Sequence, residues 1–311
     1  HIGTDILKDV VRKMRQEIVK YGGEVHFRTA LTGVSVKNGV LSGVRADGMD
    51  IPCERAVLAV GHSARDTFFA LHENGVYFEP KAFSVGVRIE HLQRDIDRAL
   101  YGKYAGHPLL PPAEYNLSRR ADGRACYSFC MCPGGVVVAA QSEEKTVVTN
   151  GMSYHARSGD NANAALAVSV DPADFDNGTP FGGVALQREI EHAAYAQTGS
   201  YRAPCQRVGD FLADRPTRKP GEVRPTYPVG VEYGCAAASL PDFAQKMLRD
   251  SLPYFGRKIR GYDSADALLT GPETRTSSPV RMKRGDDLFG LGCEGLIPCG
   301  EGAGYAGGIM S

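Results

Sequence analysis

The chain contains 311 residues, of which 42% are hydrophobic, and its 36 acidic residues balance its 36 basic residues. This length exceeds that of a typical domain and predicts one large or two medium domains. The balanced charge argues against a nucleic-acid-binding surface, and no apolar stretch is long enough to span a bilayer. Eight cysteines, too sparse for a disulfide-stapled secreted domain, favour a reducing cytoplasm.

The first 80 residues show the alternation of helix and strand that is typical of the middle of a nucleotide-binding domain. In chain order, the patterns predict a helix from Thr4 or Asp5 to about Tyr21, strands over residues 24–28, 32–36, 40–46 and 56–60, and a second helix beginning at Ser63. Asn38-Gly39 is a strong signal for a hairpin between the second and third strands. Ser63 and Asp66 have the spacing of a capping box.

From about residue 81 the pattern changes to that of a mixed α+β domain. It predicts strands near residues 82–90, 127–131, 136–140, 146–150 and 164–170, and helices near residues 92–100, 183–198, 205–213 and 242–255. The chain is expected to re-enter the first domain at residues 291–299, which end in an apolar strand over residues 295–299. We therefore predict an α/β fold in which residues 1–80 begin the first domain, residues 81–284 form an inserted α+β domain, and residues 285–311 return to the first.

The segment 300–311 is rich in glycine and follows the apolar residues 295–299. Glycine lets the backbone approach a ligand closely and adopt positive φ without penalty. A strand that leads through such a loop into a helix N-terminus creates a site for negative charge. This arrangement resembles the C-terminal flavin-binding loop of two-domain FAD oxidoreductases.

Several further motifs extend the resemblance over the whole chain. They lie at residues 1–5, 59–66, 83–91, 129–135 (FCMCPGG), 150–153 (NGMS), 273–281 (ETRTSSPVR) and 300–308 (GEGAGYAGG). Together they resemble the bacterial FAD-dependent proteins often labelled NAD(FAD)-utilizing dehydrogenases. The resemblance implies a partial FAD/NAD(P)-binding Rossmann-like domain of the glutathione-reductase type, interrupted by a substrate domain. The N-terminal G-x-G-x-x-G fingerprint is missing, so we expect a fragment of a longer flavoprotein; the alternative is a complete protein that binds no dinucleotide.

The resemblance also implies which residues contact FAD. They are Leu31, Ala59, Val60, Gly61, His62, Gly300, Glu301, Gly302, Ala303, Gly304, Gly307, Gly308, Ile309 and Met310. Leu31 is expected near the adenine, and the segment from Gly307 near the pyrimidine edge of the flavin. Two alternatives stay open: residues 59–62 form an ordinary strand-to-helix turn, and the Glu301 carboxylate accepts hydrogen bonds from amides of its own loop.

Candidates for the substrate side of the flavin are Arg275, Ser277, Ser278 and Arg281. Their guanidinium and hydroxyl groups suit an anionic substrate or the phosphates of a nicotinamide cofactor; the alternative is a solvated loop. His62 is a candidate for proton transfer, because histidine titrates near neutral pH, or else it completes a turn. None of these residues is assigned as catalytic.

Cys126, Cys130 and Cys132 form a cluster that suggests a metal site or a redox pair. Structural zinc usually needs two well-spaced ligand pairs, and no second pair accompanies the cluster. The C-x-x-C signature of a disulfide reductase is also missing. We therefore predict buried, unreactive cysteines and no metal.

These observations predict a cytoplasmic FAD-dependent oxidoreductase that passes electrons from NAD(P)H or another hydride donor to an unknown acceptor. The alternatives are a non-catalytic module that binds flavin or another ligand, a metal-binding protein built around the cysteine cluster, and an RNA-modifying flavoprotein. The neutral charge balance disfavours the last. The expected partner is a small-molecule substrate rather than a membrane or a nucleic acid, and the oligomeric state is left open.

Overall fold

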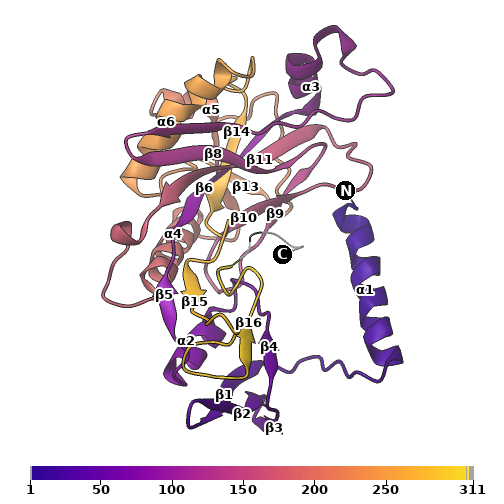
Figure 1. The fold of residues 1–311 in the computed structure, drawn as a ribbon. Coiled ribbons are helices and arrows are strands. Elements are labelled where there is room, and N and C mark those ends of the chain that lie inside the picture. The colour runs from indigo at the N-terminus through magenta and orange to yellow at the C-terminus, as the bar shows by residue number, and fades with distance from the viewer. Residues whose placement is uncertain (1, 306, 308–311) are drawn as a thin grey trace. The chain divides into compact units, whose positions relative to one another are not determined.

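The computed structural model describes residues 2–305 and 307 (Figure 1). Contacts divide the chain into two compact units, each assembled from segments that are far apart in sequence. The first unit comprises residues 1–14, 84–169 and 187–274, and the second comprises residues 15–83, 170–186 and 275–311. Two long elements, α1 (Thr4–Lys20) and α4 (Gly182–Thr198), contain residues of both units.

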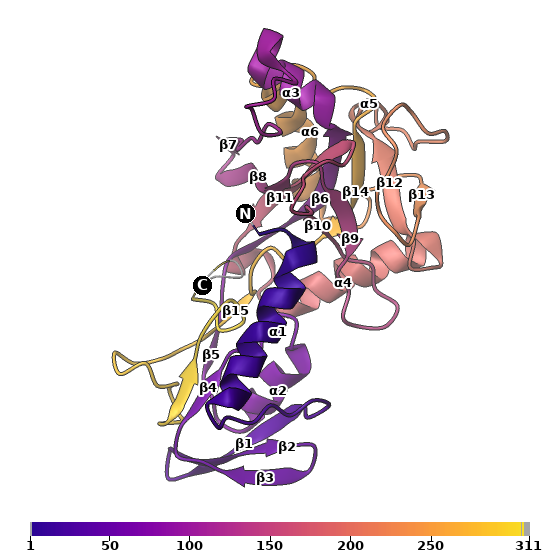
Figure 2. The ribbon, with the colours of Figure 1, turned by 90° about the vertical axis from the view of Figure 1, so that its right-hand side faces the viewer.

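The first unit is built around a large mixed sheet of seven strands (Figure 2). Helices accompany this sheet, so the fold is mixed α/β. Its strands are β6 (Phe83–Leu92), β7 (Ser118–Ala121), β8 (Arg124–Cys132), β11 (Asn161–Val170), β12 (Ala203–Arg207), β13 (Val231–Tyr233) and β14 (Leu268–Glu273), in the order β13-β12-β14-β6-β11-β8-β7. β12 and β13 are parallel, whereas β12–β14, β14–β6, β11–β8 and β8–β7 are antiparallel. The remaining elements are α3 (Gln93–Tyr101), the 3₁₀ turn η1 (Gly102–Tyr104), α5 (Val208–Leu212), α6 (Asp242–Gly256) and the separate hairpin of β9 (Val136–Ala139) and β10 (Thr149–Met152).

The centre of this sheet is closely packed at β6 and β11, which are buried along almost their whole length. A Cβ added at Gly86 of β6 would clash with the carbonyl oxygen of Leu166 on β11. Glycine is therefore required there by the close approach of two backbones. Arg88 and Glu90 are also fully buried in β6, and such charged residues need partners inside the protein.

The second unit contains a three-stranded meander and two two-stranded pairs. Its elements are β1 (Leu31–Lys37), β2 (Val40–Ala46), β3 (Met49–Pro52), β4 (Ala56–Leu58), α2 (Arg65–Glu73), β5 (Phe78–Pro80), the 3₁₀ turn η2 (Pro172–Asp174), β15 (Val280–Met282) and β16 (Leu296–Pro298). β4 pairs with β16 in parallel, and β5 pairs with β15 in antiparallel orientation. Aromatic and aliphatic side chains from α2, β5 and the segment before α4 form its core, including Phe68, Phe78 and Phe181.

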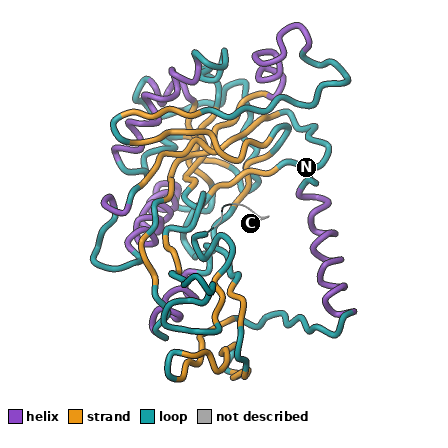
Figure 3. The backbone as a smooth tube through the Cα atoms, in the orientation of Figure 1, coloured by secondary structure: helices purple, strands orange, loops and turns teal. Residues whose placement is uncertain are grey.

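Most predicted elements are confirmed (Figure 3). Asn38 and Gly39 adopt φ angles of 53° and 80°, as the hairpin between β1 and β2 requires. The predicted strand over residues 24–28 is wrong, because Arg28 has a φ of 55° and Phe27 is 66% exposed. The predicted helix over residues 205–213 is half wrong, because its first part is β12, paired between β13 and β14.

The predicted capping box at Ser63 is also wrong. α2 begins at Arg65, and its N-cap residue is Ala64, which has no side-chain oxygen to accept an amide hydrogen bond. The helix predicted from Thr4 is confirmed as α1, although none of its 17 residues is buried. Within the described part of the chain, every helix is too short or too polar to cross a membrane.

Candidate functional site

The parallel pair of β4 and β16 brings two of the predicted cofactor segments together in the second unit. Leu58 and Pro298 are paired in register at the ends of these strands. The carboxyl ends of parallel strands lie at the same edge, so the turn at residues 59–63 and the loop at residues 300–304 emerge side by side. Ligands of open α/β sheets bind at such carboxyl edges.

A side-chain hydrogen bond joins these two segments directly. His62 Nδ1 lies 2.7 Å from Glu301 Oε1, and the side chains are 12% and 27% exposed. Glu301 therefore has a partner on the other segment, in contrast to the alternative in which only amides of its own loop bind it. His62 likewise does more than complete its own turn, because its hydrogen-bond partner, Glu301, is 239 positions away in the sequence.

The glycines of the 300–304 loop allow it to pack tightly against neighbouring backbone. A Cβ at Gly302 would clash with the backbone of Gly61, and one at Gly304 would lie 2.6 Å from the carbonyl oxygen of Val280. Gly304 and Gly61 also have φ angles of 82° and 74°. The space beside Gly61 is open, because a Cβ placed there would meet no described atom within 4 Å.

The predicted substrate-side residues take different positions around the same loop. Ser278 is buried, and its hydroxyl lies 2.9 Å from the carbonyl oxygen of Val280 and 3.2 Å from that of Gly302. It therefore braces the loop and does not present a hydroxyl outward. Arg275 is 5% exposed and donates a hydrogen bond of 2.9 Å to Ser63 Oγ, so it does not belong to a solvated loop. Ser277 is half-buried.

Two basic side chains complete the cluster, and one of them, Lys81, was not predicted. Arg281 Nε lies 3.4 Å from the carbonyl oxygen of Gly304, and its side chain is 39% exposed. Lys81 Nζ lies 3.5 Å from the carbonyl oxygen of Ser278. Burial and the nearby Arg281 guanidinium lower the pKa of the Lys81 amine, whereas the Glu301 carboxylate raises it. This cluster of Lys81, Arg275, Arg281, His62 and Glu301 is hereafter called the loop site.

Other predicted cofactor residues pack into the core, are exposed, or lie beyond the described residues. Leu31, at the start of β1, packs half-buried against the apolar core of the second unit. Val60 also packs against that core. Gly307 is exposed, while Gly308, Ile309 and Met310 lie outside the residues that the structure describes.

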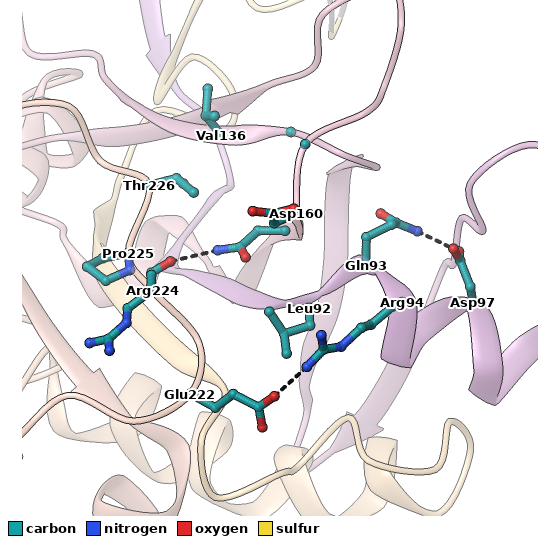
Figure 4. A pocket seen from close by; sticks show the side chains of 13 residues that line it. Leu92, Gln93, Arg94, Asp97, Val136, Asp160, Glu222, Arg224, Pro225 and Thr226 are labelled. Carbon is teal, nitrogen blue, oxygen red and sulfur yellow. Dashed lines mark hydrogen bonds and ion pairs between the residues drawn. The ribbon is translucent and has the colours of Figure 1, made fainter. Parts of the chain in front are cut away.

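The first unit has a separate polar pocket of about 620 Å³ (Figure 4). An ion pair between Arg94 and Glu222 and a hydrogen bond of 2.8 Å from Gln93 to Asp97 lie along it. Behind its wall, the buried Glu90 carboxylate accepts hydrogen bonds from Asn161 and Thr226. Burial raises the pKa of Glu90, although these hydrogen bonds oppose the shift. Sequence reasoning did not identify this pocket, which has the size of a small-molecule site.

The predicted burial of the cysteine cluster is correct for Cys126 and Cys132 and wrong for Cys130, which is exposed. Burial raises the pKa of Cys126 to about 12, as expected of an unreactive thiol. In the described part of the chain, no group of three or more His, Cys, Asp or Glu side chains is placed to hold a metal ion.

Comparison with known proteins assigns the chain to a family. Residues 82–276 match the family described as "FAD-dependent protein, C-terminal domain-like", and the chain belongs to this family. An uncharacterized protein of Clostridium beijerinckii (strain ATCC 51743 / NCIMB 8052) is 49% identical over 314 residues, an alignment that includes all of this chain and 59% of that protein. The chain thus spans about three-fifths of that relative's length.

Two solved structures show more distant similarity. An oxidoreductase from Methanosarcina mazei is 10% identical, with a TM-score of 0.33 over 95% of this chain and 49% of its own. CtdE in complex with FAD is also 10% identical, with a TM-score of 0.33 over 93% of this chain and 51% of its own. At this TM-score neither comparison contributes to the assignment.

Proposed function

We propose that this chain is part of an FAD-dependent oxidoreductase, and that the second unit contains a partial Rossmann-like FAD site of the glutathione-reductase type. The observation that carries the proposal is the loop site, where the ends of parallel strands β4 and β16 meet and His62 binds Glu301 at 2.7 Å. The family match supports it, because the family is one of FAD-dependent proteins. The whole protein is proposed to be longer than this chain and to act in the cytoplasm, where free cysteines such as the eight found here persist.

The residues of the loop site fit a dinucleotide with a negatively charged diphosphate. Lys81, Arg275 and Arg281 contribute three positive charges. Burial and the Arg281 guanidinium lower the pKa of the Lys81 amine, although Arg281 also forms an ion pair of 3.7 Å with Glu79. An anion would relieve this repulsion and form charge-assisted hydrogen bonds. The open space beside Gly61 lets the backbone of the turn approach such a ligand.

FAD, when bound, supplies the redox chemistry, and the protein binds, orients and shields it. In this proposal the basic side chains hold the diphosphate, while the Glu301 carboxylate keeps the His62 imidazole in one orientation. The proposed electron donor is NAD(P)H, and the acceptor is a small molecule. The polar pocket of the first unit is the proposed substrate site within the inserted domain.

The test is an absorbance spectrum of the purified full-length protein, recorded before and after anaerobic addition of NADPH and then NADH. Oxidised-flavin absorbance that bleaches on addition would support the oxidoreductase. Bound flavin that neither nucleotide reduces would favour a non-catalytic flavin-binding module. A protein that remains colourless after reconstitution with FAD would refute both.

The loop site itself is tested by Lys81→Met, with the exposed Lys37→Met of the same unit as the control. Loss of one charge-assisted hydrogen bond should weaken FAD binding about tenfold or more. FAD affinity, measured by flavin fluorescence during titration, should remain unchanged in Lys37→Met. Equal affinities of the two variants would place the flavin elsewhere.

A further inference from the structure

Cys130 lies in an irregular part of β8 where one extra residue enters the strand. Cys132 and Phe129 of β8 pair in register with Asn163 and Ala165 of β11, so two residues of β8 face one residue of β11. Cys130 itself has a φ of 46°, a left-handed conformation that is uncommon for a residue with a side chain. Backbone strain of this kind persists only where the surroundings enforce it.

The surroundings that enforce it are a buried ion-pair network. Arg88 donates a hydrogen bond of 2.8 Å from Nη1 to the carbonyl oxygen of Cys130. The same guanidinium donates to both oxygens of Glu273, at 2.7 and 3.1 Å, and to Asn150 Oδ1 at 3.0 Å. Arg88 is fully buried and Glu273 is 3% exposed, so the network is a rigid support for the distorted strand.

The distortion brings two thiols of different character together. In a regular strand, residues two apart are separated by about 6.6 Å, which is more than the Cβ–Cβ separation of a disulfide, about 3.5–4.5 Å. Here the Cys132 thiol donates a hydrogen bond of 3.3 Å to the carbonyl oxygen of Cys130, so the two residues are in direct contact. Cys130 is exposed and Cys132 is buried.

The environment of the pair favours a thiolate on the exposed member. The hydrogen bond from Cys132 and the charge of Arg88 lower the pKa of Cys130 to about 6, although partial desolvation of the thiol by its neighbours opposes them. The shared hydrogen bond and burial raise the pKa of Cys132. An accessible thiolate beside a protonated second thiol is the arrangement found in thiol–disulfide exchange.

We propose that Cys130 and Cys132 form a dithiol pair that exchanges two electrons with small disulfides. The Cys130 thiolate attacks one sulfur of the small disulfide, so that a bond to Cys130 forms, the original S–S bond breaks and one small thiolate leaves. Cys132 gives its proton to that leaving thiolate, and its sulfur attacks Cys130, which releases the second half as a thiolate. The protein pair is oxidised to a disulfide, and the small disulfide is reduced to two thiol equivalents.

The test uses the reduced full-length protein, oxidised glutathione as the probe, and peptide mass spectrometry as the readout. The wild-type protein should lose two free thiols and form a Cys130–Cys132 disulfide without a retained glutathione. Cys132→Ser should retain one glutathione on Cys130, because the second step is blocked. Cys130→Ser should retain none at this site, and Cys235→Ser, which removes a half-buried cysteine of the same unit, should behave as the wild type.

A wild-type protein that forms no Cys130–Cys132 disulfide would overturn the proposal, and so would a Cys132→Ser variant that retains no glutathione on Cys130. Thermal melting of each variant establishes that it is folded before exchange is measured. Because the readout is a mass and not a flavin spectrum, the outcome does not depend on whether the loop site binds FAD.

Discussion

Two arginines with the same nitrogen–oxygen distance to a carboxylate should differ sharply in their contribution to stability. Arg88 lies 2.7 Å from Glu273, with side chains 0% and 3% exposed, whereas Arg12 lies 2.7 Å from Asp9, with side chains 59% and 44% exposed. Breaking a buried pair leaves an uncompensated charge in a poorly solvated place, at a cost of about 3–5 kcal/mol. Exposed pairs contribute less than about 1 kcal/mol.

We therefore expect Arg88→Met to lower the free energy of unfolding by about 3–5 kcal/mol and Arg12→Met by less than about 1 kcal/mol, both measured by urea denaturation. The double variant Arg88→Met/Glu273→Met should recover part of the loss, because it removes both members of the buried ion pair. A double variant less stable than Arg88→Met would show that the network contributes more than charge compensation.

The reactivity of Cys130 should follow the ionisation of its thiol. Because its pKa is lowered to about 6, the thiolate is present above that pH and is lost as the pH falls through it. The rate of Cys130 alkylation by iodoacetamide, followed by peptide mass spectrometry, should rise to a midpoint at about pH 6 and then level off. In Cys132→Ala the midpoint should move toward that of an ordinary thiol, about pH 8.5. An unchanged midpoint would assign the lowered pKa to another cause.

At the scale of elements, two glycines of the second unit are needed for different reasons. Gly302 is needed because another backbone packs closely against it, and Gly39 is needed because of its positive φ. Gly302→Ala would bring a Cβ against the backbone of Gly61, whereas Gly39→Ala in the turn between β1 and β2 would meet no described atom within 4 Å. Gly39 has a φ of 80°, so Gly39→Ala should cost only about 1–2 kcal/mol in the free energy of unfolding.

Gly302→Ala should instead displace the 300–304 loop from Gly61 and abolish FAD binding. Flavin content after reconstitution and urea denaturation measure the two effects in the same samples. If Gly302→Ala retains its flavin, close packing of the loop on Gly61 is not needed for the cofactor.

Elements specified by local signals were predictable from the sequence, and elements specified by distant partners were not. The Asn38-Gly39 turn needs only neighbouring residues, and it was correctly predicted. β12 reads as a helix from its own residues, but pairing with β13 and β14 makes it a strand. Propensity is a weak guide when tertiary contacts compete with it.

The same distinction applies to the residues of the proposed sites. Residues 300–304 were predicted from a glycine pattern and residues 59–62 from the family resemblance, and the two segments lie together because β4 and β16 pair in parallel. Lys81 joins the loop site through the fold, without a local signal around it. Arg88 and Glu90 did carry a signal, because two charged residues inside the apolar strand β6 require buried partners.

At the scale of the whole molecule, each unit is assembled from three separate segments of the chain. Residues 170–186 belong to the second unit because side chains such as Phe181 pack into its core. No pattern within those residues indicates this packing, because their partners lie on α2 and β5, about 100 residues earlier in the chain.

The loop site and the Cys130–Cys132 pair lie in different units, so they should respond to substitution separately. Lys81, Arg281 and Glu301 belong to the second unit, whereas Cys130, Cys132 and Arg88 belong to the first. Lys81→Met should therefore lose FAD affinity and retain the Cys130–Cys132 exchange, while the double variant Cys130→Ser/Cys132→Ser should lose exchange and retain its flavin. Flavin titration and glutathione-exchange mass spectrometry, performed on both variants, give the complete comparison. The residues that lower the pKa of Cys130 all lie in the first unit. Loss of thiol exchange in Lys81→Met would therefore contradict this independence. It would show that the flavin itself takes part in the redox cycle of the pair.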